Sequence, residues 1–147
     1  MSQITSEWVQ LENGLRAWYA RPADVGPHPA VLIFIEAFGV NAHFQDVAQR
    51  LARAGYCAMV PDLYHGKTYD YSDFDGAIGH LKTLNDAVVM QEAGLAIQAL
   101  QQRAEVRKDA IGRGVLAHGR HADAVAQGDA AQRPGGKQLV RHADAPR

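Results

Sequence analysis

Residues 30–41, Ala-Val-Leu-Ile-Phe-Ile-Glu-Ala-Phe-Gly-Val-Asn, decide the fold of this chain. The first six are continuously apolar and lack the alternation typical of a strand with one face in water. Such a run predicts a strand buried on both faces, as in the middle of a parallel sheet. Glu36 then closes the strand, and Asn41 is a suitable cap for a following helix.

Working outward from this stretch, apolar periodicity predicts alternating strands and helices. The helix over 41–54 places Phe44, Val47, Ala48 and Leu51 on one face, and Gly55 ends it. Before this stretch, the sequence predicts a hairpin of 7–12 and 15–21 around an Asn13-Gly14 type I′ turn, followed by a loop over 22–29. After it come a strand over 56–60 and a long surface loop over 63–79. A helix is predicted over 81–100, with Leu84, Val88, Ala96 and Ile97 at helical spacing, and then the start of a strand over 106–111. This order predicts an α/β fold, a mostly parallel sheet flanked by helices.

Composition excludes several classes of protein. The 147 residues are 47% hydrophobic with a net charge of −1, which gives no electrostatic reason to expect nucleic acid or an anionic membrane as partner. The first ten residues have neither a basic nor an apolar region, so no signal peptide is expected, and the run 30–35 is too short to span a bilayer. The single cysteine, Cys57, excludes an internal disulfide and fits a reducing compartment. We expect a soluble cytoplasmic protein without cofactor or metal.

The composition changes near residue 112. Every aromatic residue lies at or before Phe74, and the last isoleucine is Ile111. Residues 113–147 are rich in Ala, Gly, Arg, His, Asp and Gln, and can bury little apolar area against the entropy of ordering. We therefore expect a folded part, 1–112, and a disordered, non-homologous tail, 113–147.

Two blocks of the sequence resemble the dienelactone hydrolase family. The first is His28–Asn41, with Glu-Ala-Phe-Gly at 36–39, and the second is Gly55–Tyr64, with Gly-Tyr and Pro-Asp-Leu-Tyr. Between them, residues 46–52 read Asp-Val-Ala-Gln-Arg-Leu-Ala, which is similar to the family's helix. The resemblance covers roughly Trp8 to Gly112 and implies the amino-terminal part of an α/β-hydrolase.

The resemblance also implies a chemistry, the opening of lactones or carboxylic esters by a Cys-His-Asp triad. Glu36 matches the glutamate that lies beside the nucleophile, and the backbone N–H of Ala37 matches an oxyanion donor. The alternative for Glu36 is a solvated residue at the end of a strand. Cys57 is expected to be an ordinary core residue, because nothing around it resembles Gly-x-Cys-x-Gly.

Other side chains have plain alternatives. The loop with Tyr64, Tyr69 and Tyr71 can line a pocket, but an aromatic surface loop is the default reading. His43 and His80 are expected to be ordinary helix or loop residues.

The family pattern fails at the position of the nucleophile. The family continues into an elbow of the form Gly-Phe-Cys-Met-Gly-Gly, whereas residues 111–120 read Ile-Gly-Arg-Gly-Val-Leu-Ala-His-Gly-Arg. No Cys or Ser is present there, and the sequence ends before the expected triad Asp and His. The sequence is thus predicted to be a truncated and inactive member of the family.

A shift of reading frame near Gly112 would explain both the missing elbow and the change of composition. His-Gly-Arg encoded CAT-GGG-CGG reads Met-Gly-Gly one base later, although Ala117 would not become Cys without another change. The alternative is new chemistry in the tail, where His-Ala-Asp-Ala occurs at His121 and at His142. His and Asp two residues apart in a flexible segment supply neither a triad nor a metal site.

Two other functions compete with that of a hydrolase. A non-catalytic fragment would associate with itself or another chain through an exposed sheet edge. A dinucleotide-binding domain is disfavoured, because Glu-Ala-Phe-Gly stands where Gly-x-Gly-x-x-Gly would be needed.

Overall fold

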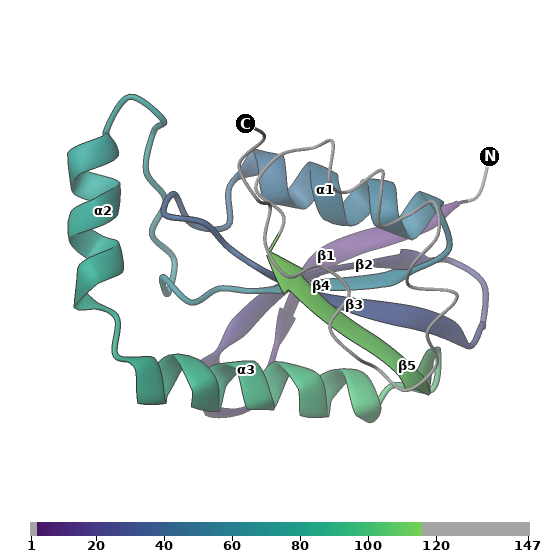
Figure 1. Ribbon diagram of the computed structural model, residues 1–147. Coiled ribbons are helices and arrows are strands. Elements are labelled where there is room, and N and C mark those ends of the chain that lie inside the picture. Colours follow the sequence, from purple (N-terminus) through teal and green to yellow (C-terminus); the bar gives the residue numbers. More distant parts are fainter. Residues whose placement is uncertain (1–2, 116–147) are drawn as a thin grey trace, which may run out of the picture.

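The computed structural model describes residues 3–115 and the side chains as far as Gly112. It is a five-stranded sheet in the order β1-β2-β4-β3-β5, with helices on both faces (Figure 1). The elements are β1 (Ile4–Gln10), a 3-10 turn (Glu12–Gly14), β2 (Arg16–Pro22), β3 (His28–Phe34), α1 (Ala42–Arg53), β4 (Cys57–Pro61), α2 (Phe74–Thr83), α3 (Asp86–Gln101) and β5 (Val106–Val115).

The sheet is mixed, with one reversed strand. β3 pairs in parallel with β4 and with β5, while β2 is antiparallel to both β1 and β4. All strands except β2 therefore point the same way, so the expected mostly parallel sheet flanked by helices is confirmed. Among residues 3–115, β5 pairs with β3 alone and forms one edge of the sheet.

The amino-terminal hairpin is confirmed, but its turn is longer than expected. Asn13 and Gly14 both have positive φ, 60° and 74°, as the sequence predicts. They lie in the 3-10 turn, which is closed by a hydrogen bond of 2.7 Å from the N–H of Leu11 to the carbonyl of Leu15. The N–H of Leu15 donates to the carbonyl of Glu12 at 3.3 Å across Asn13-Gly14, as in the expected type I′ turn, but Gln10 pairs with Arg16, so the connection between the strands is longer than two residues.

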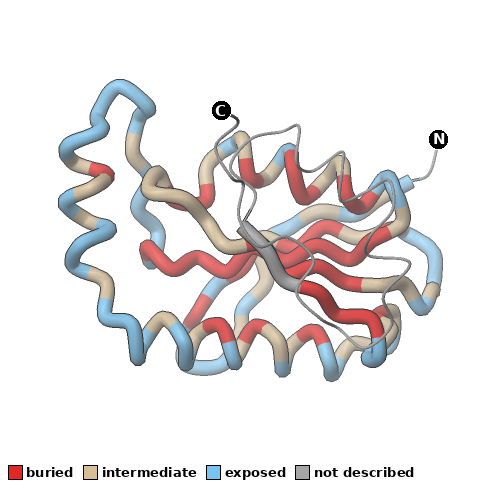
Figure 2. The backbone as a smooth tube through the Cα atoms, viewed as in Figure 1, coloured by how far each residue is buried: buried red, intermediate tan, exposed pale blue. Residues whose placement is uncertain are grey.

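Each face of the sheet has its own core. On β3, Val31 and Ile33 face α1, whereas Ala30 and Leu32 face α3. Figure 2 shows the buried residues concentrated in the strands and in the inward sides of these two helices. Because both faces are covered, the uninterrupted apolar run of β3 is explained.

Helix α1 agrees closely with its sequence prediction. Asn41 Oδ1 accepts a hydrogen bond of 3.2 Å from the N–H of Phe44. The predicted apolar face is buried, and Gly55 follows with φ of 103°.

The long loop over 63–79 and the single helix over 81–100 are both wrong in detail. A separate helix, α2, begins at Phe74, where the Asp73 side chain caps the N–H of Gly76. Asn85 then caps α3 through the N–H groups of Ala87 and Val88, after Leu84 has left the helical conformation with ψ of 136°. Val88 is 44% exposed rather than buried. Two local caps therefore interrupt what apolar periodicity reads as one helix.

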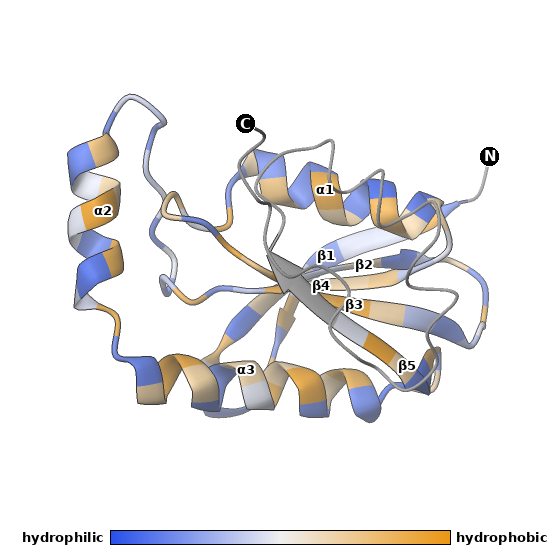
Figure 3. Cartoon of the chain, in the orientation of Figure 1, coloured by the Kyte–Doolittle hydropathy of each residue, from blue (hydrophilic) through white to orange (hydrophobic). Residues whose placement is uncertain are grey.

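Helix α2 stands apart from the two cores. Ala77 is its only buried residue, and much of the helix is exposed in Figure 2. Figure 3 shows hydrophobic residues along it, and Phe74 and Leu81 are exposed.

The carboxyl-terminal expectations lie mostly outside the described residues. β5 continues to Val115, past Gly112, where the folded part was expected to end. The disordered tail is expected over 113–147 and the reading-frame shift near Gly112; most of this tail, residues 116–147 with the repeated His-Ala-Asp-Ala, lies outside the described residues. Within the described residues, no helix has the length and apolar character needed to cross a bilayer.

Candidate functional site

Glu36 and Ala37 lie in the turn that follows β3, at the carboxyl edge of the parallel strands. The turn is closed by a hydrogen bond of 3.4 Å from the N–H of Gly39 to the carbonyl of Glu36. Both Glu36 and Ala37 are partly exposed, whereas Gly39 and Val40 are buried. In open α/β sheets, ligands bind at this edge of the parallel strands.

Gly39 fixes the path of this turn for two reasons. Its φ is +85°, a conformation that residues with a side chain rarely adopt. A Cβ at this position would also lie 2.4 Å from the carbonyl oxygen of Lys67. The glycine thus lets the loop after β4 pass directly against the turn after β3.

The two loops are held together by main-chain and side-chain hydrogen bonds. The N–H of Tyr69 donates to the carbonyl of Phe38 at 3.0 Å. Asn41 caps α1 with its Oδ1 and donates from its Nδ2 to the hydroxyl of Tyr71 at 3.1 Å. The rings of Phe38 and Tyr71 meet edge to face at 4.8 Å. The turn after β3 is therefore held both to α1 and to the loop after β4.

The N–H of Ala37 lies in this turn, directly after Glu36. Within residues 3–115 it makes no backbone hydrogen bond. A main-chain donor at the end of a buried strand is held rigidly, so it can stabilise negative charge on a ligand oxygen with little reorganisation.

The end of β5 lies beside the end of β3. Their parallel register pairs Ile33 with Gly114 and Phe34 with Val115. The chain therefore leaves β5 at the edge where the Glu36 turn lies, as an elbow nucleophile after β5 would require. The sequence that follows, from residue 116, lies outside the described residues.

The aromatic residues of the β4 loop are divided between core and surface. Tyr64 is 2% exposed, stacks on His80 of α2 at 4.0 Å, and donates from its hydroxyl to the carbonyl of Ala77 at 3.4 Å. Burial raises the pKa of Tyr64 above its ordinary value. Tyr69 Oη lies 2.9 Å from His80 Nδ1, and Tyr71 is exposed. The prediction of a surface loop is wrong for Tyr64. Through their contacts with His80, Tyr64 and Tyr69 hold α2 against the loop after β4.

Cys57 lies at the opposite edge, at the start of β4. It is fully buried, and its Sγ donates weakly to the carbonyl of Glu105 at 3.8 Å. Burial raises the pKa of the thiol, so it is a poor nucleophile. The prediction of a core cysteine is confirmed.

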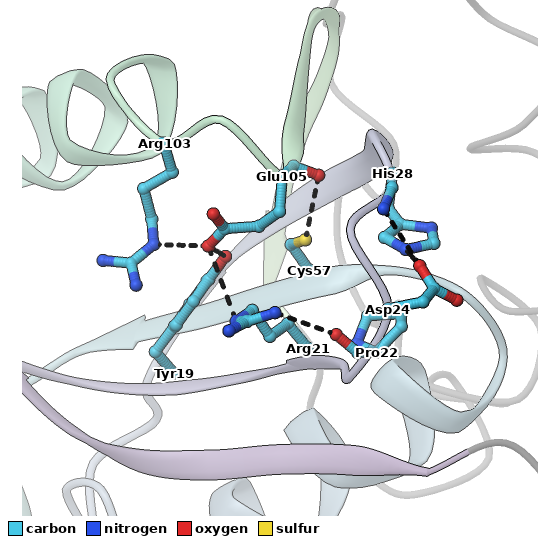
Figure 4. Close-up of polar contacts among 9 residues, drawn as sticks. Tyr19, Arg21, Pro22, Asp24, His28, Cys57, Arg103 and Glu105 are labelled. Atoms are coloured by element: carbon cyan, nitrogen blue, oxygen red, sulfur yellow. Dashed lines mark hydrogen bonds and ion pairs between the residues drawn. The ribbon is translucent and has the colours of Figure 1, made fainter.

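A polar cluster that sequence analysis does not predict closes this amino edge (Figure 4). Glu105 Oε2 accepts from Tyr19 Oη at 2.8 Å and from Arg103 Nε at 2.7 Å, and Arg21 Nε lies 3.6 Å away. Burial alone would raise the pKa of Glu105, but the hydrogen bonds from Arg103 and Tyr19 outweigh it and hold the pKa at about 2. The cluster ties the β5 entry to β2.

No group of His, Cys, Asp and Glu in the described residues has the arrangement of a metal site. The described part of the site is thus built of a carboxylate, a main-chain donor and aromatic side chains.

The sheet order, the flanking helices and the turn after β3 define an α/β-hydrolase fold. The sequence model of the Dienelactone hydrolase family matches residues 15–119. This chain therefore belongs to the dienelactone hydrolase family.

Individual relatives agree with this assignment. A protein of Bradyrhizobium sp named probable 2-oxo-3-(5-oxofuran-2-ylidene)propanoate lactonase is 34% identical over 74% of this chain and 46% of its own length. A putative carboxymethylenebutenolidase of Yersinia pestis is 41% identical over 46% of this chain and 26% of its own. The crystal structure of a putative dienelactone hydrolase from Klebsiella pneumoniae superposes with a TM-score of 0.69 at 25% identity, covering 78% of this chain and 50% of that one. The present chain thus spans half or less of the length of these relatives.

Proposed function

We propose that this sequence derives from a hydrolase of small carboxylic esters or lactones, and that the 147-residue chain itself is inactive or severely impaired. The observation that carries the proposal is the Glu36–Ala37 turn, set where β3 and β5 end side by side. The names of the relatives, a lactonase and carboxymethylenebutenolidases, support ester or lactone bonds as the target.

In the proposed mechanism a cysteine thiolate after β5 attacks the carbonyl carbon of the substrate. The carbonyl oxygen becomes an oxyanion, which the N–H of Ala37 stabilises, and Glu36 beside the thiol takes part in its activation. Collapse of the oxyanion breaks the ester C–O bond and releases the alcohol, which takes a proton from the triad histidine. Water then hydrolyses the thioester and releases the carboxylic acid.

The impairment follows from the residues that this sequence places after β5. Residues 113–119 read Arg-Gly-Val-Leu-Ala-His-Gly, without Cys or Ser. The one cysteine is buried at the opposite edge, and the last serine is Ser72. The chain thus supplies an oxyanion donor and a carboxylate but no nucleophile for them to assist.

Hydrolysis of p-nitrophenyl acetate by the purified chain tests the proposal. We expect no rate above that of Glu36→Ala, and Cys57→Ser serves as the matched control for the buried thiol. A rate that falls with Glu36→Ala would show a working site and overturn the impairment. A rate that falls with Cys57→Ser alone would locate the nucleophile at the opposite edge and overturn the assignment of the site.

The open edge of β5 favours a second function, association through the sheet. Among residues 3–115 this strand has a partner on one side only, and an unpaired strand edge is a template for another chain. Light scattering after size exclusion tests it. A monomer at all protein concentrations would exclude association.

A further inference from the structure

A polar cavity of about 390 Å³ lies where β2 begins and β4 ends. Three segments line it: the β1–β2 connection, the loop after β4, and α3. No residue of the 36–40 turn takes part. The polar side chains that line it belong to Gln10, Asn13, Arg16, Asp62, His65 and Glu92.

A fixed guanidinium forms one wall of this cavity. Arg16 Nη2 lies 3.3 Å from Asp62 Oδ2, and the guanidinium carbon lies 4.2 Å from the centre of the Trp8 ring. Asp62 also accepts the N–H of Gly66 at 2.7 Å, and it is the one buried charged residue in the described part of the chain. The Arg16 side chain remains 43% exposed. Asp62 and the Trp8 ring therefore set the position of the Arg16 guanidinium, while its other N–H groups can reach a ligand.

An imidazole–carboxylate pair forms the facing wall. His65 Nε2 lies 2.7 Å from Glu92 Oε2, and Glu92 is largely buried while His65 is exposed. His65 has a positive φ of 51°, which is uncommon for a residue with a side chain. The loop thus adopts a strained conformation that places the imidazole against α3.

The available groups select a ligand with both a carboxylate and a hydroxyl. Asp62 is already occupied by Arg16 and Gly66, so the guanidinium, with the amides of Gln10 and Asn13, offers donors for a carboxylate. At the other wall, Glu92 and His65 together can accept from and donate to a hydroxyl. We propose that this cavity binds a small hydroxycarboxylate, the class of compound formed when a lactone ring opens.

Four charged or titratable groups line the cavity: Arg16 from β2, Asp62 and His65 from the loop after β4, and Glu92 from α3. Each of the two carboxylates already has a partner, Arg16 for Asp62 and His65 for Glu92.

Calorimetric titration of the 147-residue chain with 4-hydroxybutyrate tests the proposal, with butyrate and 1,4-butanediol as comparison ligands. We expect 4-hydroxybutyrate to bind about tenfold more tightly than either comparison ligand, since each lacks one of the two groups. Arg16→Lys should weaken binding about tenfold, because an ammonium cannot replace the planar fork. Arg107→Lys on β5 is the matched control, since its partner is the exposed Asp109.

Trp8 provides a second readout that reports folding and binding separately. Because Arg16 lies over its ring, a ligand on the guanidinium should change its fluorescence, and thermal unfolding shows whether each variant is folded. Equal binding of all three compounds, or an unchanged affinity in folded Arg16→Lys, would overturn the proposal. Because ester hydrolysis is not measured, inactivity toward p-nitrophenyl acetate has no bearing on this test.

Discussion

The two edges of the parallel strands are closed in different ways. At the amino edge, where β3, β4 and β5 begin, side chains of Glu105, Tyr19, Arg103 and Arg21 converge (Figure 4). At the carboxyl edge, the turn after β3 is held mainly by the main chain and by Asn41. Charged side chains around Glu105 therefore close the amino edge, whereas main-chain and amide hydrogen bonds hold the turn after β3 at the carboxyl edge.

A large effect is expected from Glu105→Gln at the amino edge. Removing the carboxylate leaves two arginines without their common partner, and we expect a loss of about 2 kcal/mol in the free energy of unfolding at pH 7. This figure allows for screening by solvent at a carboxylate that is partly exposed. Urea denaturation of the variant and of Glu12→Gln, a change at an exposed glutamate, would measure it. Equal stability of the two variants would mean that the cluster does not hold this edge.

The contribution of Glu105 to stability should depend on pH. The pKa of Glu105 in the folded chain is about 2, below its ordinary value of 4.5, so its contribution is present above the unfolded pKa. It is lost as the pH falls through about 4.5 toward 2. Wild type and Glu105→Gln should therefore converge in stability between pH 5 and pH 2, as measured by denaturation at a series of pH values. A constant difference over this range would contradict the proposed role of the ionised carboxylate.

At the carboxyl edge, Gly39→Ala should break the contact between the two loops. The new Cβ would meet the carbonyl of Lys67 at 2.4 Å in addition to the strain of a positive φ, and we expect a loss of about 2 kcal/mol. Gly55→Ala is the matched control, because Gly55 also has positive φ but nothing within 4 Å of the added methyl. It should cost about 1 kcal/mol. If both variants lose the same stability, close packing of the loops contributes nothing.

Asn41→Ala tests the second support of the same turn. Loss of the helix cap should cost about 1 kcal/mol, and loss of the hydrogen bond to Tyr71 should loosen the β4 loop. Asn85→Ala removes the cap of α3 without such a contact. Hydrogen exchange should therefore increase at Tyr69 in Asn41→Ala but not in Asn85→Ala.

The smallest effect is expected in α2, outside both cores. Gly79 lies in this helix with nothing within 4 Å of an added Cβ. Gly79→Ala should raise the free energy of unfolding by about 0.5 kcal/mol through helix propensity alone. Thermal unfolding measures the gain, and a loss of stability would show that α2 is packed more tightly than its exposure indicates.

The sequence predicts the fold well where a signal is local. The apolar run at 30–35 indicates β3, and Asn41 followed by a regular apolar face indicates α1. Apolar periodicity does not predict helix α2, because this helix buries only Ala77. The break before α3 depends on Asn85, which fits a helix interior and a cap alike.

The polar clusters are not predicted from the sequence for another reason. Arg16 and Asp62 are 46 residues apart in the sequence, and Tyr19 and Glu105 are 86 apart. None of these side chains alone indicates its partner in the sequence, and only the pairing of strands brings them together. Glu36 and Ala37 were accessible from the sequence because one short motif contains both, whereas their chemical roles remain predictions.

The separation of the two cores has a spectroscopic consequence. Both tryptophans of the chain, Trp8 and Trp18, pack against the core beneath α1, with their rings 5.4 Å apart. Emission excited at the red edge of the absorption band therefore reports on one side of the sheet, and loosening of α3 on the other side would pass unseen.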